Sequence, residues 1–318
     1  MKHFLAETDF GPADRAEAFA LARSFKTHRY GSTPPTLNRQ SWGMLFYKNS
    51  TRTRVSFEVG IHELGGHPLV LDVARTQLGR GESVEDSARV FSRYLHGMVI
   101  RAYEHERVEQ FAAAADIPVI NALTDKLHPC QIYSDAFTLA ERWGGDTGDP
   151  LASLQGRTLA FFGDIGSNMA QSWILGAHVF GMRVVLCGPD TFRPDAAFLK
   201  EVETLQPEQD LYRFTTDPRE AADAADVLYT DVFVSMGDEA EREARLAAMA
   251  PYRVTAELLE TAGPDCWFMH CLPAHPGEEV DQAVVDSAQS IIFDQAENRL
   301  HMQKAILSVL AEARRSQA

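Results

Sequence analysis

The sequence predicts an α/β protein with two doubly wound domains, each built around a mainly parallel central sheet. Short apolar runs alternate with stretches of helical period along the chain, which is typical of βαβ units. The pattern is interrupted at 144–150 (GGDTGDP) and then restarts, so a domain boundary is predicted there. A length of 318 residues also fits about two domains. We expect the active site in the cleft between them.

The first domain is expected to span 1–147. Its predicted strands are the apolar runs 43–47, 68–72, 97–101 and 117–121. Its predicted helices are 52–65, 82–95, 106–115 and 130–144. In the first of these helices Phe57, Ile61 and Leu64 recur at helical spacing, and Gly65-Gly66 ends the pattern.

The second domain is expected to span 148–298. Its predicted strands are 158–162, 183–187, 226–230, 267–271 and 290–293. Its predicted helices are 168–180, 195–205 and 238–249. A final Ala/Leu-rich helix at about 299–318 is expected to pack back onto the first domain.

Charge and composition exclude several classes of protein. The chain has 30 Lys and Arg against 45 Asp and Glu, a net charge of −15, which disfavours binding to nucleic acid or a membrane surface. No apolar run approaches membrane-spanning length, and MKHFLAETDF lacks the apolar core of a signal peptide. The 4 cysteines do not make a disulfide framework, so we expect reduced thiols and a cytoplasmic protein. The phosphate loop GxxxxGK[ST] is absent, which argues against a nucleotide triphosphatase.

The most informative motif is STRTR at 50–54, between the apolar run 43–47 and the helix that follows. At a strand-to-helix junction the first backbone N–H groups of the helix and its dipole favour an anion. Three hydroxyls and two guanidiniums suit a tetrahedral oxyanion with several acceptor oxygens. The alternative is an ordinary helix N-cap with solvated charges.

Further polar residues follow other strands of the first domain. Arg101 ends the run GMVIR, where a charge lies on the ligand side of a parallel sheet, although a solvated loop arginine is the alternative. His128 and Gln131, in HPCQ, can polarise a carbonyl group, and a structural histidine is the alternative. Gln77 stands in a loop with Gly79 and Gly81 that is either mobile and functional or a surface turn.

The second domain has a similar set of polar residues. The turn GDIGSN, which ends at Asn168, lacks the GxGxxG of a dinucleotide site, so it indicates a nicotinamide cofactor only weakly. Such a turn can instead hold the polar groups of an amino acid. Asp231 at a strand end could hold an ammonium group or cap a helix, and Ser235-Met236-Gly237 could form an adaptable loop.

A cysteine and histidine cluster near 270 invites a metal interpretation. It contains Cys266, His270, Cys271 and His275. Alternate residues of a strand face opposite sides, so we expect Cys266, His270 and Cys271 not to converge. A partly exposed Cys271 thiol at a strand end, able to ionise beside cations, is the preferred interpretation. Arg299 follows the last predicted strand and adds a guanidinium.

The motifs STRTR (50–54), HPCQ (128–131), VSMG (234–237) and HCLP (270–273) occur in the order found in one family. Over essentially the whole chain the sequence resembles the aspartate/ornithine carbamoyltransferase family, and VSMG and HCLP point to its ornithine-using members. Two departures stand out. Ser167 replaces a common Asn, and Tyr47-Lys48-Asn49 replaces a common Glu-Lys-Pro or Glu-Lys-Ser.

The resemblance implies a carbamoyl phosphate site in the first domain. Arg52 and Arg101 would neutralise the phosphate, while His128 and Gln131 would polarise the carbamoyl group. The implied contacts with carbamoyl phosphate come from Ser50, Thr51, Arg52, Thr53, Arg101, His128 and Gln131. Gln77 resembles a residue that family members contribute to the active site of a neighbouring subunit. This implies a homotrimer, or a multiple of trimers, with shared active sites.

The resemblance also implies an ornithine site in the second domain. The α-amino acid end would contact Asn168, Asp231, Ser235 and Met236. Cys271 and Leu272 would lie beside the reacting amine, and Arg299 beside the carbamoyl group. The implied catalytic residues are Arg52, Arg101, His128, Asp231, Cys271 and Arg299. The implied reaction turns ornithine and carbamoyl phosphate into citrulline and phosphate, and it requires no metal, flavin or nicotinamide.

Three alternatives stay open at this point. The first is a carbamoyltransferase for another amine, such as putrescine, aspartate or an acylated ornithine, against which VSMG and HCLP argue. The second is a nicotinamide-dependent dehydrogenase, disfavoured by the missing fingerprint. The third is a non-catalytic binding or scaffold protein, disfavoured by the number of polar residues placed at strand ends.

Overall fold

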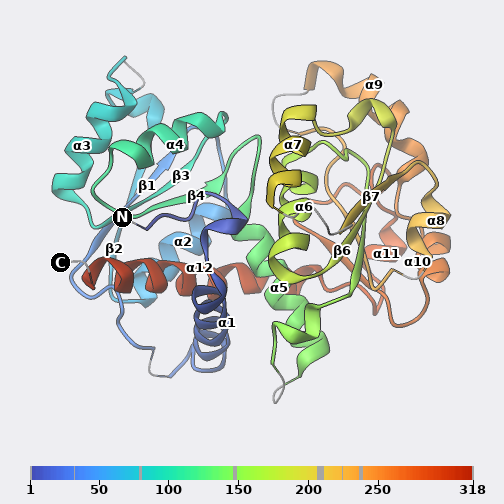
Figure 1. Cartoon of the computed structure of the whole chain (residues 1–318), viewed down its shortest axis with the longest axis horizontal. Coiled ribbons are helices and arrows are strands. Elements are labelled where there is room, and N and C mark those ends of the chain that lie inside the picture. Colours follow the sequence, from blue (N-terminus) through green and yellow to red (C-terminus); the bar gives the residue numbers. More distant parts are fainter. Residues whose placement is uncertain are drawn as a thin grey trace. The chain divides into compact units, whose positions relative to one another are not determined.

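A computed structural model describes residues 2–31, 33–78, 81–145, 149–205, 211–223, 225–235 and 239–316. The chain forms two compact units, Met1–Phe137 with Glu297–Ala318, and Thr138–Ala296 (Figure 1). It passes from one unit to the other within helix α5 (Pro129–Gly144) and again within helix α12 (Ile292–Arg315). None of the helices in these ranges is both long and apolar enough to span a membrane.

The described residues of the first unit form a parallel sheet of 4 strands in the order β2-β1-β3-β4. The strands are β1 (Ser41–Phe46), β2 (His67–Asp72), β3 (Gly97–Arg101) and β4 (Val119–Leu123). The helices that precede or connect them are α1 (Pro12–Thr27), α2 (Arg52–Glu63), α3 (Val84–Tyr94) and α4 (His105–Ala114). Strand positions follow the predicted apolar runs to within about two residues. Phe57, Ile61 and Leu64 are buried, as the helical spacing predicted.

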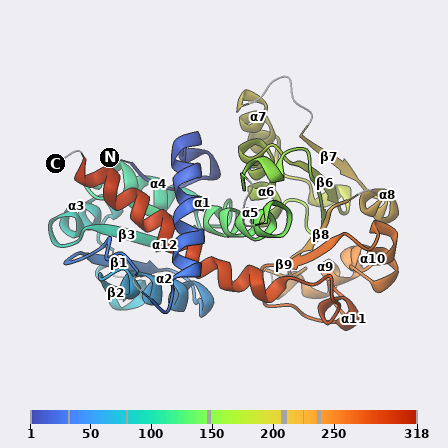
Figure 2. The same cartoon turned by 90° about the horizontal axis from the view of Figure 1, so that it is seen from below.

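Helix α1 crosses α12 within the first unit (Figure 2). Lys26 Nζ of α1 donates to Asn298 Oδ1 of α12 at 2.9 Å. Lys304 of α12 is fully buried, donates to Glu63 Oε2 of α2 at 2.6 Å, and places its Nζ 4.9 Å from the Phe25 ring centre. A buried ammonium group requires such partners, so this contact fixes α12 against α2.

The described residues of the second unit form a parallel sheet of 5 strands in the order β7-β6-β5-β8-β9. The strands are β5 (Thr158–Phe162), β6 (Arg183–Cys187), β7 (Tyr212–Thr215), β8 (Val227–Thr230) and β9 (Trp267–His270). The helices that lie wholly in this unit are α6 (Asn168–Phe180), α7 (Ala196–Leu205), α8 (Pro218–Ala222), α9 (Arg242–Met249), α10 (Ala256–Ala262) and α11 (Gln282–Val285).

Two strand assignments in the second unit need correction. The predicted strand 290–293 is wrong, because Ser290 makes only an isolated bridge with Phe268 and α12 begins at Ile292. Ile291 and Ile292 are both buried, and a short apolar run does not distinguish a strand from the start of a buried helix. Strand β7 was not predicted, because this four-residue edge strand contains no fully buried residue.

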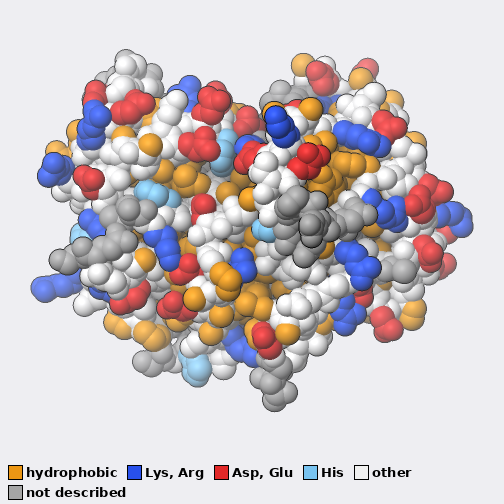
Figure 3. Space-filling view, in the orientation of Figure 1, with side chains coloured by type: hydrophobic (Ala, Val, Ile, Leu, Met, Phe, Trp, Pro, Cys, Tyr) orange, Lys and Arg blue, Asp and Glu red, His pale blue; other side chains and the backbone are white. Residues whose placement is uncertain are grey.

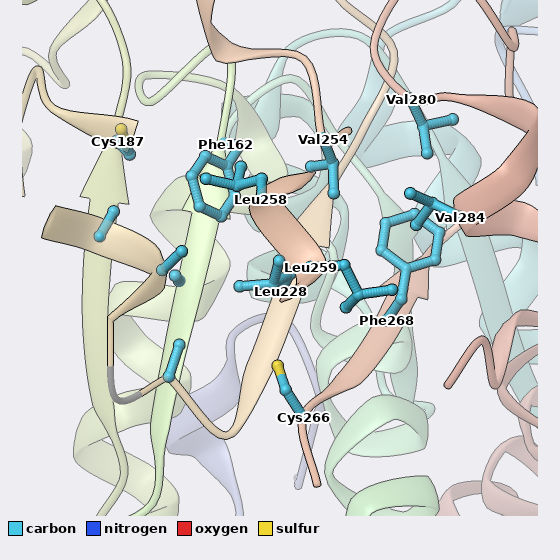
Figure 4. Close-up of a cluster of buried hydrophobic side chains, with 14 of the residues drawn as sticks. Phe162, Cys187, Leu228, Val254, Leu258, Leu259, Cys266, Phe268, Val280 and Val284 are labelled. Atoms are coloured by element: carbon cyan, nitrogen blue, oxygen red, sulfur yellow. The ribbon is translucent and has the colours of Figure 1, made fainter. Parts of the chain in front are cut away.

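One apolar cluster packs helices against one face of the second sheet (Figure 4). Phe162, Leu228 and Phe268 come from three neighbouring strands, and Leu258 and Leu259 of α10 pack against them. Cys266 belongs to the same cluster. Burial raises the pKa of its thiol to about 12, as befits a cysteine packed in an apolar core.

The surface in Figure 3 mixes acidic and basic side chains over the coloured part of the face shown. No continuous basic area covers that part of the face.

Candidate active site

The STRTR motif forms the predicted strand-to-helix junction. Strand β1 ends at Phe46, and α2 begins at Arg52 with no acidic residue in its first turn. The Thr53 N–H donates to Ser50 Oγ at 3.3 Å. Thr51 and Arg52 are exposed. The exposed start of α2 is therefore an electropositive position with a guanidinium beside it.

Two guanidiniums meet at one hydroxyl in the first unit. Arg101 Nη1 donates to Thr53 Oγ1 at 3.2 Å, and Arg299 Nη2 donates to the same oxygen at 3.3 Å. All three side chains are buried. The Thr53 hydroxyl accepts from both guanidiniums and carries no charge itself, so two positive side chains lie beside one neutral oxygen. The end of β3, the first turn of α2 and α12 bring these residues together.

Gln131, in the first turn of α5, adjoins this cluster. Its Oε1 accepts from Arg299 Nη1 at 2.5 Å, and its Nε2 donates to Asp135 Oδ1 at 2.7 Å. Gln131 and Asp135 are both buried. Asp135 was not predicted from the sequence. Its position four residues after Gln131, on the same face of the helix, was the available signal.

His128 is buried just before α5. Burial lowers the pKa of its imidazole well below the ordinary value, and the positive charges of Arg299, Arg101 and Lys48 lower it further. His128 is therefore neutral at pH 7 and can donate one ring N–H. A neutral imidazole in this place can polarise a carbonyl oxygen without adding charge.

Asp231 and Cys271 meet at the ends of neighbouring strands in the second unit. Thr230 of β8 pairs with His270 of β9, so the residues that follow them lie side by side. Cys271 Sγ donates to Asp231 Oδ1 at 3.0 Å. Because residues 231–235 belong to no helix, the alternative that Asp231 caps a helix is wrong.

The HCLP segment holds its histidine in one tautomer. His270 Nδ1 accepts from the Leu272 N–H at 2.9 Å, so Nε2 carries the proton and faces Glu279 Oε1 at 3.2 Å. His270 and Glu279 are both buried. Leu272 has a φ of 61°, a left-handed conformation that is rare for residues other than glycine.

Of Cys266, His270 and Cys271, which were expected not to converge, His270 and Cys271 do come together, whereas Cys266 is not part of their group. Asp231, His270 and Cys271 place one potential ligand atom each within 4.8 Å of one another. Strand β9 ends at His270, so the alternation of a strand no longer governs Cys271. The Nδ1 atom of His270 is nevertheless engaged by the Leu272 N–H, which reduces its capacity to bind a metal.

The remaining predicted residues lie at loops and helix ends. Asn168 is the first residue of α6, and the side chain of Ser167 caps this helix by accepting from the Ala170 N–H at 3.3 Å. Ser235 is half-buried, while Met236 lies outside the described residues. Gln77 is exposed.

Comparison with known proteins gives the family. Residues 2–141 match the carbamoyl-P binding domain of the aspartate/ornithine carbamoyltransferases, and residues 155–310 match their Asp/Orn binding domain. The chain belongs to the aspartate/ornithine carbamoyltransferase family. The family resemblance and the two-domain α/β fold predicted from the sequence are thereby confirmed.

Several members of this carbamoyltransferase family are similar over their full length. A protein named ornithine carbamoyltransferase from Syntrophus aciditrophicus is 48% identical over 311 residues, covering 97% of this chain and 99% of that one. One of the same name from Methanoculleus marisnigri is 46% identical, covering 96% of each. The solved structure of ornithine carbamoyltransferase from Pyrococcus furiosus has a TM-score of 0.89 at 40% identity, covering 98% of this chain and 97% of that one.

The lowered pKa of His128 predicts a specific acid sensitivity. Below pH about 6.5 the unfolded chain protonates this residue and the folded chain does not, so the free energy of unfolding falls as pH falls. One such histidine lowers the free energy of unfolding by about 1.4 kcal/mol for each unit by which the pH falls. His128→Gln should therefore lose stability less steeply than the parent as the pH falls below about 6.5, measured by urea unfolding. Equal slopes in the two proteins would contradict the assignment.

Proposed function

We propose that this protein is an ornithine carbamoyltransferase, which transfers the carbamoyl group of carbamoyl phosphate to the δ-amine of L-ornithine. The products are L-citrulline and phosphate. The observation that carries the proposal is the meeting of Arg101 and Arg299 at Thr53, beside the start of α2. Close relatives named ornithine carbamoyltransferase support the choice of acceptor.

In this proposal each domain binds one of the two substrates. Domain 1–147, with the helix at 299–318, binds carbamoyl phosphate, and domain 148–298 binds ornithine. The amine held by one domain must reach the carbonyl carbon held by the other. The cleft predicted from the sequence therefore stays part of the proposal.

The phosphate end of carbamoyl phosphate lies at the start of α2. Ser50, Thr51, Arg52 and Thr53 offer hydroxyls, a guanidinium and the first N–H groups of the helix, and Arg101 adds a second positive charge. Phosphate leaves as an anion, so groups already oriented toward it stabilise the transition state more than the ground state. No metal, flavin or nicotinamide takes part.

The carbamoyl group lies among His128, Gln131 and Arg299. Neutral His128 donates to the carbonyl oxygen, and Arg299 stabilises the negative charge that develops on this oxygen. The orientation of Gln131 favours a contact other than the carbonyl. Its Oε1 faces Arg299 and has a second lone pair, which can accept from the carbamoyl NH₂.

Ornithine occupies the second domain. Its α-amino acid end contacts Asn168, Asp231, Ser235 and Met236, and its δ-amine lies beside Cys271 and Leu272. The Cys271 thiol donates to Asp231, so the two side chains lie together at this end of the site. Asp231 and Cys271 are the two candidates for assisting the loss of the amine proton.

The chemical step conserves atoms and charge. The neutral δ-amine attacks the carbonyl carbon and forms the C–N bond, the C–O bond to phosphate breaks, and phosphate leaves with the bonding electrons. The amine proton passes to a neighbouring acceptor. An amine with a pKa of about 10.4 costs about 4–5 kcal/mol to deprotonate at pH 7, so activity should rise toward alkaline pH.

The assembly is a homotrimer, or a multiple of trimers, in which Gln77 reaches a neighbouring active site. The protein acts in arginine metabolism in the cytoplasm. The free thiols of all 4 cysteines fit a reducing compartment. The leading alternative is the same transfer to putrescine, aspartate or an acylated ornithine, which a comparison of acceptors at fixed carbamoyl phosphate separates.

A citrulline-formation assay with carbamoyl phosphate and ornithine tests the activity and the role of Arg52 together. Arg52→Ala should lower kcat/KM by about 30- to 1,000-fold, because contacts to a transferring anion contribute roughly 2–4 kcal/mol. Arg54→Ala is the matched control, because Arg54 is exposed and pairs with Glu58 at 3.5 Å. A folded Arg52→Ala protein with near-parental turnover would remove Arg52 from the site. Absence of citrulline with the parent enzyme would reject the function.

Shared active sites predict complementation. Arg52→Ala and Gln77→Ala chains should each be nearly inactive, and mixed trimers should regain activity at sites built from two intact contributions. The measurement is citrulline formation after subunit exchange, verified with differently tagged chains. Activity that stays at the level of the separate variants, or a fully active monomer, would exclude sharing through Gln77.

Asp231→Asn tests the acceptor site because it removes a charge and nearly preserves shape. The kcat/KM for ornithine should fall by about tenfold or more, whereas the affinity for carbamoyl phosphate should change little, since charge-assisted contacts contribute about 1.5–3 kcal/mol. Putrescine, which has no α-carboxylate to orient, should lose less. Steady-state kinetics with both amines from pH 6 to 9 measure these effects. Unchanged ornithine kinetics, or a parent that prefers putrescine, would favour the alternative acceptor.

A further inference from the structure

Asp135 is a buried carboxylate that the reaction proposed above does not use. It lies one turn after Gln131 on α5, and both residues belong to the first unit. Gln131 has 1% of its surface exposed and Asp135 has none. The Gln131 amide is held at both ends, by Asp135 Oδ1 at 2.7 Å and by Arg299 Nη1 at 2.5 Å.

The chemistry of these partners determines which way the amide points. A guanidinium only donates hydrogen bonds, so the Gln131 atom facing Arg299 must be the oxygen. Once the oxygen faces Arg299, the amide nitrogen faces Asp135, and it donates to Oδ1 of this residue. The two contacts agree, and together they hold Oε1 as a hydrogen-bond acceptor next to the buried guanidinium.

A ligand group that meets this oxygen must donate a hydrogen bond. Carbamoyl phosphate presents an NH₂ group there, whereas acetyl phosphate, of nearly the same size, presents a methyl group that cannot donate. A site built around a buried polar atom discriminates strongly against a ligand that leaves this atom unpaired. The acceptor role of Gln131 belongs to the proposed function, and the inference about Asp135 rests on it.

We propose that Asp135 is a positioning residue that sets the preference for carbamoyl over acetyl phosphate by orienting the Gln131 amide. The glutamine side chain has several rotatable bonds, and the contact with Arg299 fixes only its oxygen. Without an acceptor at position 135, Nε2 is left buried and unpaired, so the amide turns or shifts to find another partner. Oε1 then leaves the position from which it accepts from the ligand.

Direct binding measurements on the full-length protein test this proposal without turnover. The parent, Asp135→Leu and Asp135→Asn proteins are titrated calorimetrically with fresh carbamoyl phosphate, acetyl phosphate and inorganic phosphate. In Asp135→Leu the ratio of the Kd for acetyl phosphate to that for carbamoyl phosphate should fall by about tenfold. The Kd for inorganic phosphate should stay within about twofold of the parent value. Asp135→Asn, which can still accept from Nε2, should keep the ratio within about threefold.

The same substitution made in a Gln131→Leu protein distinguishes a positioning role of Asp135 from a general structural effect. If Asp135 acts through Gln131, then in a Gln131→Leu protein the further change Asp135→Leu should leave the ratio unchanged. Asp135→Ala repeats the measurement with a smaller side chain in case leucine is not accommodated. Weaker binding of all three ligands in parallel, or an unchanged ratio in Asp135→Leu, would overturn the proposal.

The same titrations distinguish failure of the inference from failure of the proposed function. A parent protein that binds carbamoyl phosphate no better than acetyl phosphate would reject the carbamoyl site itself, and the role of Asp135 with it. A parent that discriminates, together with an Asp135→Leu protein that discriminates equally well, would reject only the role of Asp135.

Discussion

The carbamoyl-P binding domain depends on two buried guanidiniums that share the hydroxyl of Thr53. Arg101 comes from the end of β3 and Arg299 from α12, so one threonine in the first turn of α2 joins segments far apart in the chain. Burying two like charges is unfavourable unless an anion joins them. In the proposed function the same pair of guanidiniums binds the anionic substrate, carbamoyl phosphate.

The residues around this pair add hydrogen-bonding groups without adding positive charge. His128 is kept neutral by burial and by the surrounding positive charges, so it supplies a hydrogen bond without further repulsion. The Gln131 amide takes a hydrogen bond from Arg299 at one end and gives one to Asp135 at the other. Buried polar networks of this kind restrict the orientations available to each member. In the Asp/Orn binding domain, the hydrogen bond from Cys271 to Asp231 holds a thiol and a carboxylate together at the ends of two strands.

The local sequence pattern predicted most of the strands. It also predicted the two helices that begin within the STRTR and HPCQ motifs. The exceptions have physical causes. Ile291 and Ile292 begin a buried helix, and a short apolar run looks the same in a strand. Strand β7 is short and has no fully buried residue, so its signal was weak. Asp135 was not predicted, because only the structure shows its contact with Gln131. The spacing of four residues between the two was visible in the sequence.

Periodicity along the chain predicted two α/β domains, and motifs such as STRTR and HPCQ carried the resemblance to the family, because both signals lie in short stretches of sequence. Which polar side chains meet depends on the tertiary structure. Arg299 reaches Thr53 across 246 positions, and Cys271 reaches Asp231 across 40. It also decided the neutral state of His128 and the orientation of Gln131, because burial and hydrogen-bond direction depend on neighbours that lie far away in the sequence.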